Sequence, residues 1–140
     1  MRSVYLTAAV LCIGLIGAEQ AMACSCIAIS TRDALEQSDA ALVGKLVEVD
    51  RVSNDTLKLS YRVKRVFKGA PGLDRGDRLT LRSLDSEAAC GLPHRRDKRY
   101  GLLLDRRNKR LTANLCSVVP PKKLRRAAEG NAKGKLCGRA

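Results

Sequence analysis

The clearest hydrophobic pattern in the chain is a regular alternation of apolar and polar residues over residues 56–69. Two faces separate when this segment is extended: Leu57, Leu59, Tyr61 and Val63 on one, and Lys58, Ser60, Arg62 and Lys64 on the other. A period of two residues is typical of an antiparallel strand with one buried face. The same alternation returns at residues 78–84 through Leu79 and Leu81. We therefore predict two half-buried strands in this part of the chain.

Three further segments are predicted as strands because they are rich in β-branched and apolar residues. The first covers residues 40–52, where Gly44 indicates a bulge or a sharp bend. The other two cover residues 99–105 and 110–119, and the polar segment 106–109 is expected to join them as a hairpin. Residues 53–55 read as a turn, and residues 69–77 read as a loop.

Short helices are predicted on either side of the strands. Residues 30–39 fit a helix whose start resembles a capping box, with Ser30 and Asp33 in the two key positions. Pro121 suits the first turn of a second helix, which we expect to reach about Glu129.

These elements predict a mainly β fold in a single domain. One short N-terminal helix, about five strands and a C-terminal helix favour a five-stranded Greek-key barrel of the OB type. The domain is expected to cover residues 24–140, with a basic tail over about 120–140.

The first 23 residues have the layout of a secretory signal peptide. Arg2 supplies a basic start, an apolar run follows to Ala18, and Ala21-Met22-Ala23 forms a cleavage site. We expect cleavage after Ala23, which leaves Cys24 at the N-terminus of a secreted or periplasmic protein. The membrane then serves only as the export route.

A lipoprotein signal is the alternative reading of the same segment, because a cysteine follows the predicted cut. Two features favour the secretory reading. The apolar run does not continue to Cys24, and position 21 is Ala where a lipobox usually has Leu.

Charge adds a possible role in binding anions. The chain carries a net charge of +13, and the loss of Arg2 and Glu19 with the signal leaves that value unchanged. Residues 95–110 are the densest basic run: Arg95, Arg96, Lys98, Arg99, Arg106, Arg107, Lys109 and Arg110. Such a run is often no more than solvated surface. The functional alternative is affinity for an extracellular polyanion, such as a polysaccharide or lipid head groups.

Five cysteines remain after the predicted cleavage: Cys24, Cys26, Cys90, Cys116 and Cys137. In an exported protein we read them first as disulfides. An odd number leaves one cysteine free or paired outside the chain. Neighbours in a C-x-C pattern do not easily bridge each other, so Cys24 and Cys26 each need a distant partner.

Zinc binding is the rival interpretation of these cysteines. Cys90 and His94 form a C-x3-H pattern that could join Cys24 and Cys26 as ligands. Catalysis has little support, because His94 is the only histidine and no catalytic pattern of Ser, His and Asp is present. We expect no enzymatic activity and no cofactor.

Four segments together resemble the N-terminal domain of the tissue inhibitors of metalloproteinases, and more closely the small bacterial members of that family. They are Cys-Ser-Cys at 24–26, "YRVKRVFKG" at 61–69, "EAACG" at 87–91 and "LCS" at 115–117. The resemblance covers nearly all of residues 24–140. It implies an OB barrel with flanking helices and the disulfides Cys24–Cys90 and Cys26–Cys116. It leaves Cys137 unpaired, because Glu36 stands near the place of its partner.

The resemblance also implies a mode of action. The α-amine and carbonyl oxygen of Cys24 would chelate the catalytic zinc of a target metalloprotease, and Ser25 would enter its specificity pocket. Cys26 would hold this segment, and Ala88 and Ala89 would widen the contact. The chain departs from the family at Ile27-Ala28, where many members have a residue followed by Pro.

Two functional hypotheses follow. The first is a secreted inhibitor of zinc metalloproteases that acts through Cys24. The second is an extracellular or envelope module that binds polyanions and has no inhibitory activity. Nucleic acid is not an expected partner, because OB domains stack bases on exposed aromatic side chains. Here Tyr61 and Tyr100 are in phase with core leucines.

Overall fold

The computed structural model describes residues 24–69 and 72–137, with side chains up to residue 130. The predicted signal peptide and its cleavage after Ala23 lie outside the described residues. The elements, in chain order, are α1 (Thr31–Gln37), β1 (Ala40–Arg51), β2 (Thr56–Lys68), β3 (Arg78–Leu84), the 3-10 turn η1 (Glu87–Ala89), β4 (Arg99–Arg107), β5 (Arg110–Thr112), the 3-10 turn η2 (Leu115–Ser117), β6 (Val118–Val119) and α2 (Pro121–Cys137).

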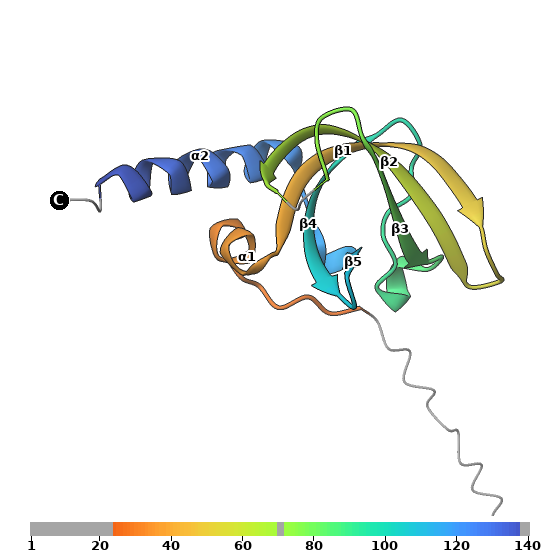
Figure 1. Ribbon diagram of the computed structural model, residues 1–140. Coiled ribbons are helices and arrows are strands. Elements are labelled where there is room, and N and C mark those ends of the chain that lie inside the picture. The colour runs from red at the N-terminus through yellow and green to blue at the C-terminus, as the bar shows by residue number, and fades with distance from the viewer. Residues whose placement is uncertain (1–23, 70–71, 138–140) are drawn as a thin grey trace, which may run out of the picture.

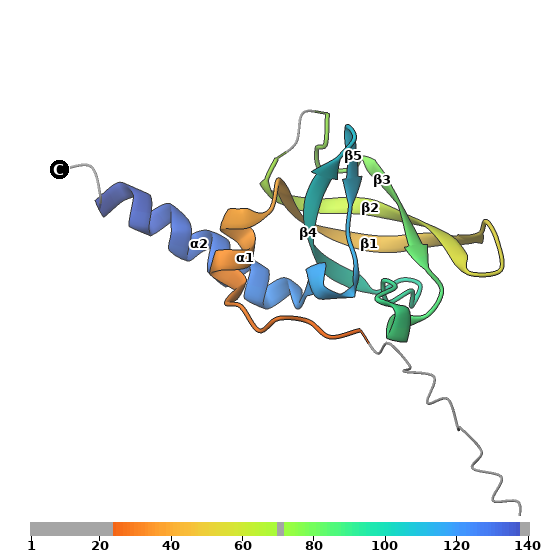
Figure 2. The ribbon, with the colours of Figure 1, turned by 90° about the horizontal axis from the view of Figure 1, so that it is seen from below.

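All pairs of neighbouring strands are antiparallel, in the order β3-β2-β1-β4-β5, and β6 also pairs with β4. The sheet curls strongly, so that β4 and β5 cross the direction of β1 and β2 (Figures 1 and 2). Among the described residues, β3 and β5 each pair with one strand, so the hydrogen-bonded ladder is open. The prediction of a mainly β fold with two helices is confirmed, but the sheet has six strands and is not closed.

Gly44 marks an irregularity in β1, as predicted. The register between β1 and β2 shifts at three places, and one of them lies between Val43 and Gly44. A Cβ atom on Gly44 would lie 3.1 Å from Cβ of Tyr61, so any side chain there would press against the neighbouring strand. The glycine therefore allows β1 to bend closely over β2.

Residues 110–119 do not form the single strand that their apolar residues predicted. β5 ends at Thr112, and Asn114 begins the turn η2. Asn114 and Ser117 close this turn on each other: the Ser117 amide donates to the Asn114 carbonyl at 2.9 Å, and the Asn114 amide donates to Ser117 Oγ at 3.3 Å. These local bonds compete with strand pairing and turn Cys116 out of the sheet.

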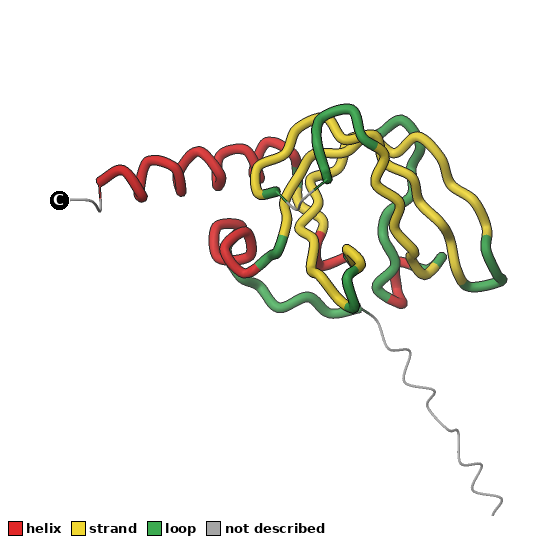
Figure 3. The backbone as a smooth tube through the Cα atoms, viewed as in Figure 1, coloured by secondary structure: helices red, strands yellow, loops and turns green. Residues whose placement is uncertain are grey.

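Both helices lie together at one end of the sheet (Figure 3). α1 begins as predicted, since Ser30 Oγ accepts the Asp33 amide at 3.1 Å. α2 corrects the prediction, because it runs to Cys137 rather than ending near Glu129. Gly130 does not stop it: a glycine inside a helix costs only about 1 kcal/mol, and its carbonyl accepts a hydrogen bond from Arg32 at 3.1 Å.

The core has two parts. The larger one lies inside the curled sheet and contains the predicted inward residues Leu57, Leu59, Tyr61 and Val63. The smaller one lies between the sheet and the helices: Leu35, Ala41, Val43, Leu103 and Leu124. β1 and β4 are thus covered on both faces, which explains their continuous apolar runs. Ser60, predicted on the polar face of β2, is also buried.

None of the helices in the described part of the chain is long and apolar enough to cross a membrane.

Candidate functional site: an N-terminal ridge held by two disulfides

The extended segment 24–30 leads from the region of η1 past η2 to α1, along the outside of the sheet (Figure 2). Two disulfides fasten its beginning. Cys24 is bonded to Cys90, and Cys26 is bonded to Cys116. These are the pairs that the family resemblance implies. The remaining cysteine of the domain, Cys137, has no described side chain.

Backbone hydrogen bonds join the same three segments. The Cys24 nitrogen donates to the Ala88 carbonyl at 2.8 Å, and the Leu115 nitrogen donates to the Cys90 carbonyl at 3.0 Å. The first bond sets residues 24–26 beside residues 88–90, and the second sets η2 beside Cys90. The Cys-Ser-Cys segment is therefore positioned by hydrogen bonds as well as by covalent bridges.

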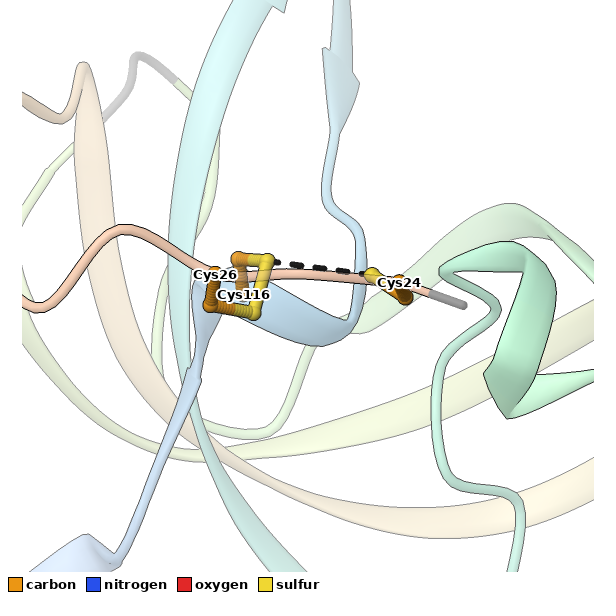
Figure 4. Close-up of side chains that lie close together, drawn as sticks. All are labelled: Cys24, Cys26 and Cys116. Atoms are coloured by element: carbon orange, nitrogen blue, oxygen red, sulfur yellow. Dashed lines mark hydrogen bonds between the residues drawn. A yellow bond between two sulfur atoms is a disulfide. The ribbon is translucent and has the colours of Figure 1, made fainter. Parts of the chain in front are cut away.

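The two disulfides touch each other. Sγ of Cys24 lies 3.9 Å from Sγ of Cys116 (Figure 4). The sulfur atoms of Cys24, Cys26 and Cys116 all lie within 4.8 Å of one another. Because disulfide sulfurs carry no proton, this is a packing contact between two bridges.

The segment "EAACG" owes its residue types to a tight turn. η1 is capped by Cys90, whose φ of 65° lies in the left-handed region and whose amide donates to the Glu87 carbonyl. At Gly91 a Cβ atom would lie 2.1 Å from the Leu84 carbonyl oxygen, so any side chain would collide with the backbone. The turn directs Cys90 toward Cys24 and leaves Ala88 and Ala89 exposed.

The predicted contact residues come from two segments that lie side by side, and we call them the N-terminal ridge: residues 24–26 with Ala88 and Ala89. Cys24 is half-buried, and the other four residues are exposed. The prediction missed Ile27 and Ile29, whose side chains are 87% and 51% exposed. Both residues lie outside every predicted strand. That place in the sequence is the signal that could have identified them as surface residues.

Open hollows flank the ridge on two sides. One is lined by Ser25, Ile27, Ile29, Thr31, Ala34, Leu103, Cys116 and Val119. The other lies between the turn joining β1 to β2 and the ridge residue Ala89, and it includes Asp55 and Asp85. The first hollow is mainly apolar, whereas the second carries two carboxylates.

His94 does not join the cysteines, contrary to the zinc alternative. Its Nε2 lies 3.9 Å from Asp85 Oδ1, and its Nδ1 lies 3.4 Å from the Leu92 carbonyl oxygen. Within the described residues, the group able to hold a metal consists of Cys24, Cys26 and Cys116 alone. Each of these sulfurs is already part of a disulfide, Cys24 with Cys90 and Cys26 with Cys116, so none is free to bind a metal.

The structure divides the predicted polyanion patch into two groups. Arg95, Arg96, Lys98 and Arg99 lie before and at the start of β4, whereas Arg106, Arg107, Lys109 and Arg110 surround its far end. All eight are exposed. β4 separates the groups by roughly 25 Å, at about 3.3 Å per residue, so they do not form one patch.

Two of the four side chains in the first basic group contact the protein itself. Arg96 donates to the Val49 carbonyl at 3.3 Å, and the Lys98 ammonium lies 5.7 Å from the centre of the Tyr100 ring. Asp97, between them, bonds Lys45 at 2.7 Å, and this hydrogen bond lowers the pKa of the Asp97 carboxyl below its ordinary value. These contacts leave the group less free to bind an external anion.

The second group sits on a projecting turn, which we call the hairpin tip: residues 106–110. Arg107 pairs with Arg110, so Asn108 and Lys109 form a two-residue turn, with φ values of 48° and 64°. Such φ values are typical of the tight turns of β-hairpins. Among the described residues, the four basic side chains of the tip make no hydrogen bond or ion pair.

Neither the protein-family models nor the curated proteins contain a match for this chain. The two disulfides are typical of proteins that fold outside the reducing cytoplasm, which is compatible with the predicted secreted or periplasmic location.

Proposed function

We propose that the chain, once processed to begin at Cys24, inhibits zinc metalloproteases by presenting that residue to the catalytic zinc. The observation that carries the proposal is the construction of the ridge. Two disulfides and the bond from the Cys24 nitrogen to the Ala88 carbonyl hold the half-buried Cys24 beside the exposed Ser25. A rigid segment loses little conformational entropy on binding, so more of the contact energy remains as affinity.

The same proposal includes the type of β fold. We take the curled sheet as an OB-type Greek-key barrel of which the described strand pairs form the open ladder. β1 pairs with both β2 and β4, so it stands at the centre of the strand order, which supports this assignment.

The chemistry needs only the backbone of Cys24. A catalytic zinc in a protease keeps one coordination position open for water. An amine nitrogen and the carbonyl oxygen of the same residue can replace that water and close a five-membered ring on the metal. An amine that gives one N–H to the Ala88 carbonyl still has a lone pair for zinc once it is unprotonated.

Side chains of the ridge would then determine which proteases are inhibited. Ser25 follows the chelating residue and is exposed, which supports its entry into a specificity pocket. Ala88 and Ala89 lie alongside and are small enough to allow close approach. Ala28 stands where many members of the family that the chain resembles have Pro. Ile27, just before it, offers an exposed apolar side chain, and the Cys26–Cys116 bridge restrains the backbone beside it.

The decisive experiment moves the free α-amine away from Cys24. The protein is exported with its own leader, and mass spectrometry establishes that it begins at Cys24. A second form carries one extra alanine ahead of Cys24, which converts the chelating nitrogen to an amide. We expect the natural form to inhibit at least one member of a panel of zinc proteases and the extended form to inhibit none.

The pH dependence gives a second readout. An ordinary α-amine has a pKa of about 7.7 to 8.0, and metal binding requires loss of its proton. Inhibition should weaken as pH falls below about 7, after correction for the titration of the protease alone. Ser25→Gly is the matched control, because it keeps the amine and should change only which proteases respond. Equal inhibition by the natural and extended forms would overturn the mechanism.

Polyanion binding is the second candidate function, and the hairpin tip is the observation that favours it. Four exposed cations gather on one turn and have no partner within the described residues. Such a group attracts an extended anionic polymer without any shaped pocket.

A further inference from the structure

Four basic residues stand in one row across four neighbouring strands. Arg78 of β3 is opposite Arg62 of β2, and Arg62 is opposite Lys45 of β1. Lys45 is in turn opposite Arg99 of β4. We call these four residues the cross-strand row. Residues directly opposite each other in antiparallel strands project from the same face of the sheet, so the four side chains share the face that points away from the larger core.

Such a row opposes the stability of the sheet, because like charges that face each other across a strand pair repel. Two members have carboxylate partners that reduce this repulsion. Lys45 Nζ lies 2.7 Å from Asp97 Oδ1, and Arg78 Nη1 lies 2.9 Å from Glu48 Oε2. These ion pairs also hold the two side chains in place.

The other two members of the row keep their charge without a partner. Arg62 lies between Lys45 and Arg78, and Arg99 lies at the end of the row; both are exposed. Within the described residues 24–69 and 72–130, neither side chain makes a hydrogen bond or an ion pair. The repulsion at these two positions is therefore not offset by the protein itself.

Arg65 adds a third cation to the same face. The register between β1 and β2 skips one residue of β2 at this point, so Arg65 is opposite Val43, which lies two residues from Lys45. Arg65 and Arg62 therefore project from the same side. The Arg65 guanidinium lies 5.0 Å from the centre of the Phe67 ring. That contact orients the side chain, whose N–H groups make no hydrogen bond among the described residues.

The shape of the row favours a linear anion over a flat anionic surface. Neighbouring strands are about 4.8 Å apart, so the row is roughly 14 Å long and one residue wide. A surface that binds lipid combines cations with apolar side chains that enter the membrane. The large hydrophobic side chains that are exposed in the described chain lie outside the row: Ile27, Ile29, Val52 and Leu84.

The same face offers little to a nucleic acid. Proteins that bind single strands stack the bases on exposed aromatic rings. Phe67, the aromatic residue that accompanies the row, is half-buried and already contacts Arg65. What the row does offer is guanidinium groups, which bind carboxylate and sulfate groups through two parallel N–H bonds.

We propose that the cross-strand row, together with Arg65, binds an acidic polysaccharide that runs across β3, β2, β1 and β4. Its carboxylate or sulfate groups contact Arg62, Arg65 and Arg99. Lys45 and Arg78 add to the site, because an ammonium has three N–H donors and a guanidinium has five, and each ion pair uses only part of them. Bound acid groups also remove the repulsion within the row.

The proposal deepens the second candidate function, on which it rests, by naming the class of polymer and a site apart from the hairpin tip. The tip lies at the far end of β4 from Arg99. Of the row, only Arg99 belongs to the basic run 95–110. Loss of the row and loss of the tip can therefore be measured separately.

The test measures binding of short acidic oligosaccharides to the disulfide-bonded protein that begins at Cys24. Oligomers of galacturonic acid supply carboxylates, and heparin oligosaccharides of similar length supply sulfates as well. Calorimetry at low salt should show binding of at least one series, and sodium chloride should weaken it steeply. Arg62→Gln combined with Arg99→Gln should weaken binding by about 10-fold or more, because charge-assisted hydrogen bonds are lost.

Arg82→Gln combined with Arg75→Gln is the matched control, because it removes the same charge from two exposed arginines outside the row. Arg82 lies on the same face, opposite Lys58. Neither arginine makes a hydrogen bond or ion pair among the described residues. This control should change binding by less than about 2-fold, because only distant, screened charges are lost.

Neutralisation of the hairpin tip distinguishes the row from the second candidate function in general. Replacing Arg106, Arg107, Lys109 and Arg110 by Gln should change binding of the short oligosaccharides by less than about 3-fold. If the tip variant abolishes this binding and the row variant does not, polyanion binding survives as a function and the row is not its site.

The row variant should remain folded, because it relieves repulsion between like charges. Without ligand its melting temperature should equal or exceed that of the natural protein, and a lower value would contradict the repulsion argued above. Three further results would overturn the proposal. They are equal weakening by the row variant and the matched control, no binding of either series at a dissociation constant below about 1 mM, and tighter row-dependent binding of single-stranded DNA or of anionic phospholipid vesicles.

Discussion

The hydroxyl of Tyr61 lies in the larger core and has no hydrogen-bond partner among the described side chains and backbone groups. Its ring meets that of Tyr100 edge to face, with centroids 6.3 Å apart. The hydroxyl of Tyr100, by contrast, accepts the Arg95 amide at 3.1 Å and donates to the Arg95 carbonyl at 3.3 Å. The two tyrosines therefore pack alike but differ in how their polar atoms are satisfied.

This difference predicts opposite effects of the same substitution. Tyr61→Phe removes an unsatisfied buried group, so it should leave the free energy of unfolding unchanged or raise it by about 1 kcal/mol. Tyr100→Phe leaves the Arg95 amide and carbonyl without their partner and should lower it by roughly 1 kcal/mol. Urea unfolding of both variants measures the two values. A loss at Tyr61 as large as at Tyr100 would contradict the assignment.

Alkaline pH gives a second test at the same residue. Burial, followed by the nearby Tyr100, raises the pKa of Tyr61 above its ordinary value of about 10. The unfolded chain then loses this proton at a pH where the folded chain keeps it. The contribution of Tyr61 to the free energy of unfolding is complete below about pH 10. As pH rises above that value, this contribution is lost by up to about 1.4 kcal/mol per pH unit.

Tyr61→Phe removes that contribution, whereas Tyr100, whose pKa burial also raises, retains its own. The free energy of unfolding should therefore fall less steeply above pH 10 in Tyr61→Phe than in the natural protein. Parallel curves for the two proteins between pH 9 and pH 11 would count against a buried, protonated Tyr61.

At the scale of elements, Lys68 links the end of β2 to the end of α1. Its ammonium donates to the carbonyl groups of Leu35, Glu36 and Ser38. The last carbonyls of a helix lack partners within the helix, and a cation is favourable at that end. α1 has no basic residue in its own last turn, so Lys68 supplies that role from β2.

Lys68→Met should lower the free energy of unfolding by roughly 1 to 3 kcal/mol, the range for losing hydrogen bonds to a charged group. Amide exchange in residues 31–38 should become faster. Lys64→Met is the matched control from the same strand, because Lys64 makes no hydrogen bond or ion pair among the described residues. Equal effects of the two variants would show that Lys68 does not cap the helix.

At the scale of the whole molecule, long-range bridges oppose a large net charge. The bonded cysteines are separated by 66 and 90 residues along the chain. On the chain-entropy account, closing loops of this length stabilises by about 4 to 5 kcal/mol each. A net charge of +13 acts in the other direction, because like charges repel in the compact state. The fold is thus held by covalent links where a larger aromatic core is lacking.

The exposed charge predicts salt-dependent binding of a polyanion such as heparin. Charges on the surface are screened within about 8 Å at physiological ionic strength, so retention on a heparin column should fall steeply with sodium chloride. Reversal of Arg106, Arg107, Lys109 and Arg110 to Glu should reduce retention most. The same change at Arg95, Arg96, Lys98 and Arg99 is the control and should have a smaller effect. Retention that ignores salt, or equal effects of the two reversals, would contradict a role for the hairpin tip.

Much of the local structure was determined by residues close together in the sequence. The alternation from Leu57 to Val63 predicted the position and inward face of β2, and Gly44 predicted the irregularity of β1. Ser30 and Asp33 predicted the start of α1. Each of these depends on contacts within a few residues or on a period of two, and neighbouring residues are enough to establish either.

Other features depended on segments that meet only in the folded chain. The sequence predicted that Cys24 and Cys26 would need distant partners, but the contact between the two bridges follows from the placement of η1 and η2 beside the N-terminal segment. The apolar pattern of residues 110–119 favoured a strand, whereas the bonds between Asn114 and Ser117 ended it. Local propensity and tertiary position compete at such sites, and composition alone does not decide between them.

The basic run shows the same division most plainly. Its charge is fixed by the sequence, but its division into two groups results from the length of β4, which carries one end away from the other. Lys68 likewise has no partner near it in the sequence and finds three carbonyls at the end of α1 only after β2 has paired with β1. Composition and periodicity determined which elements form and which faces they bury. The tertiary structure decided which distant residues meet, because those contacts depend on strand order and on the curl of the sheet.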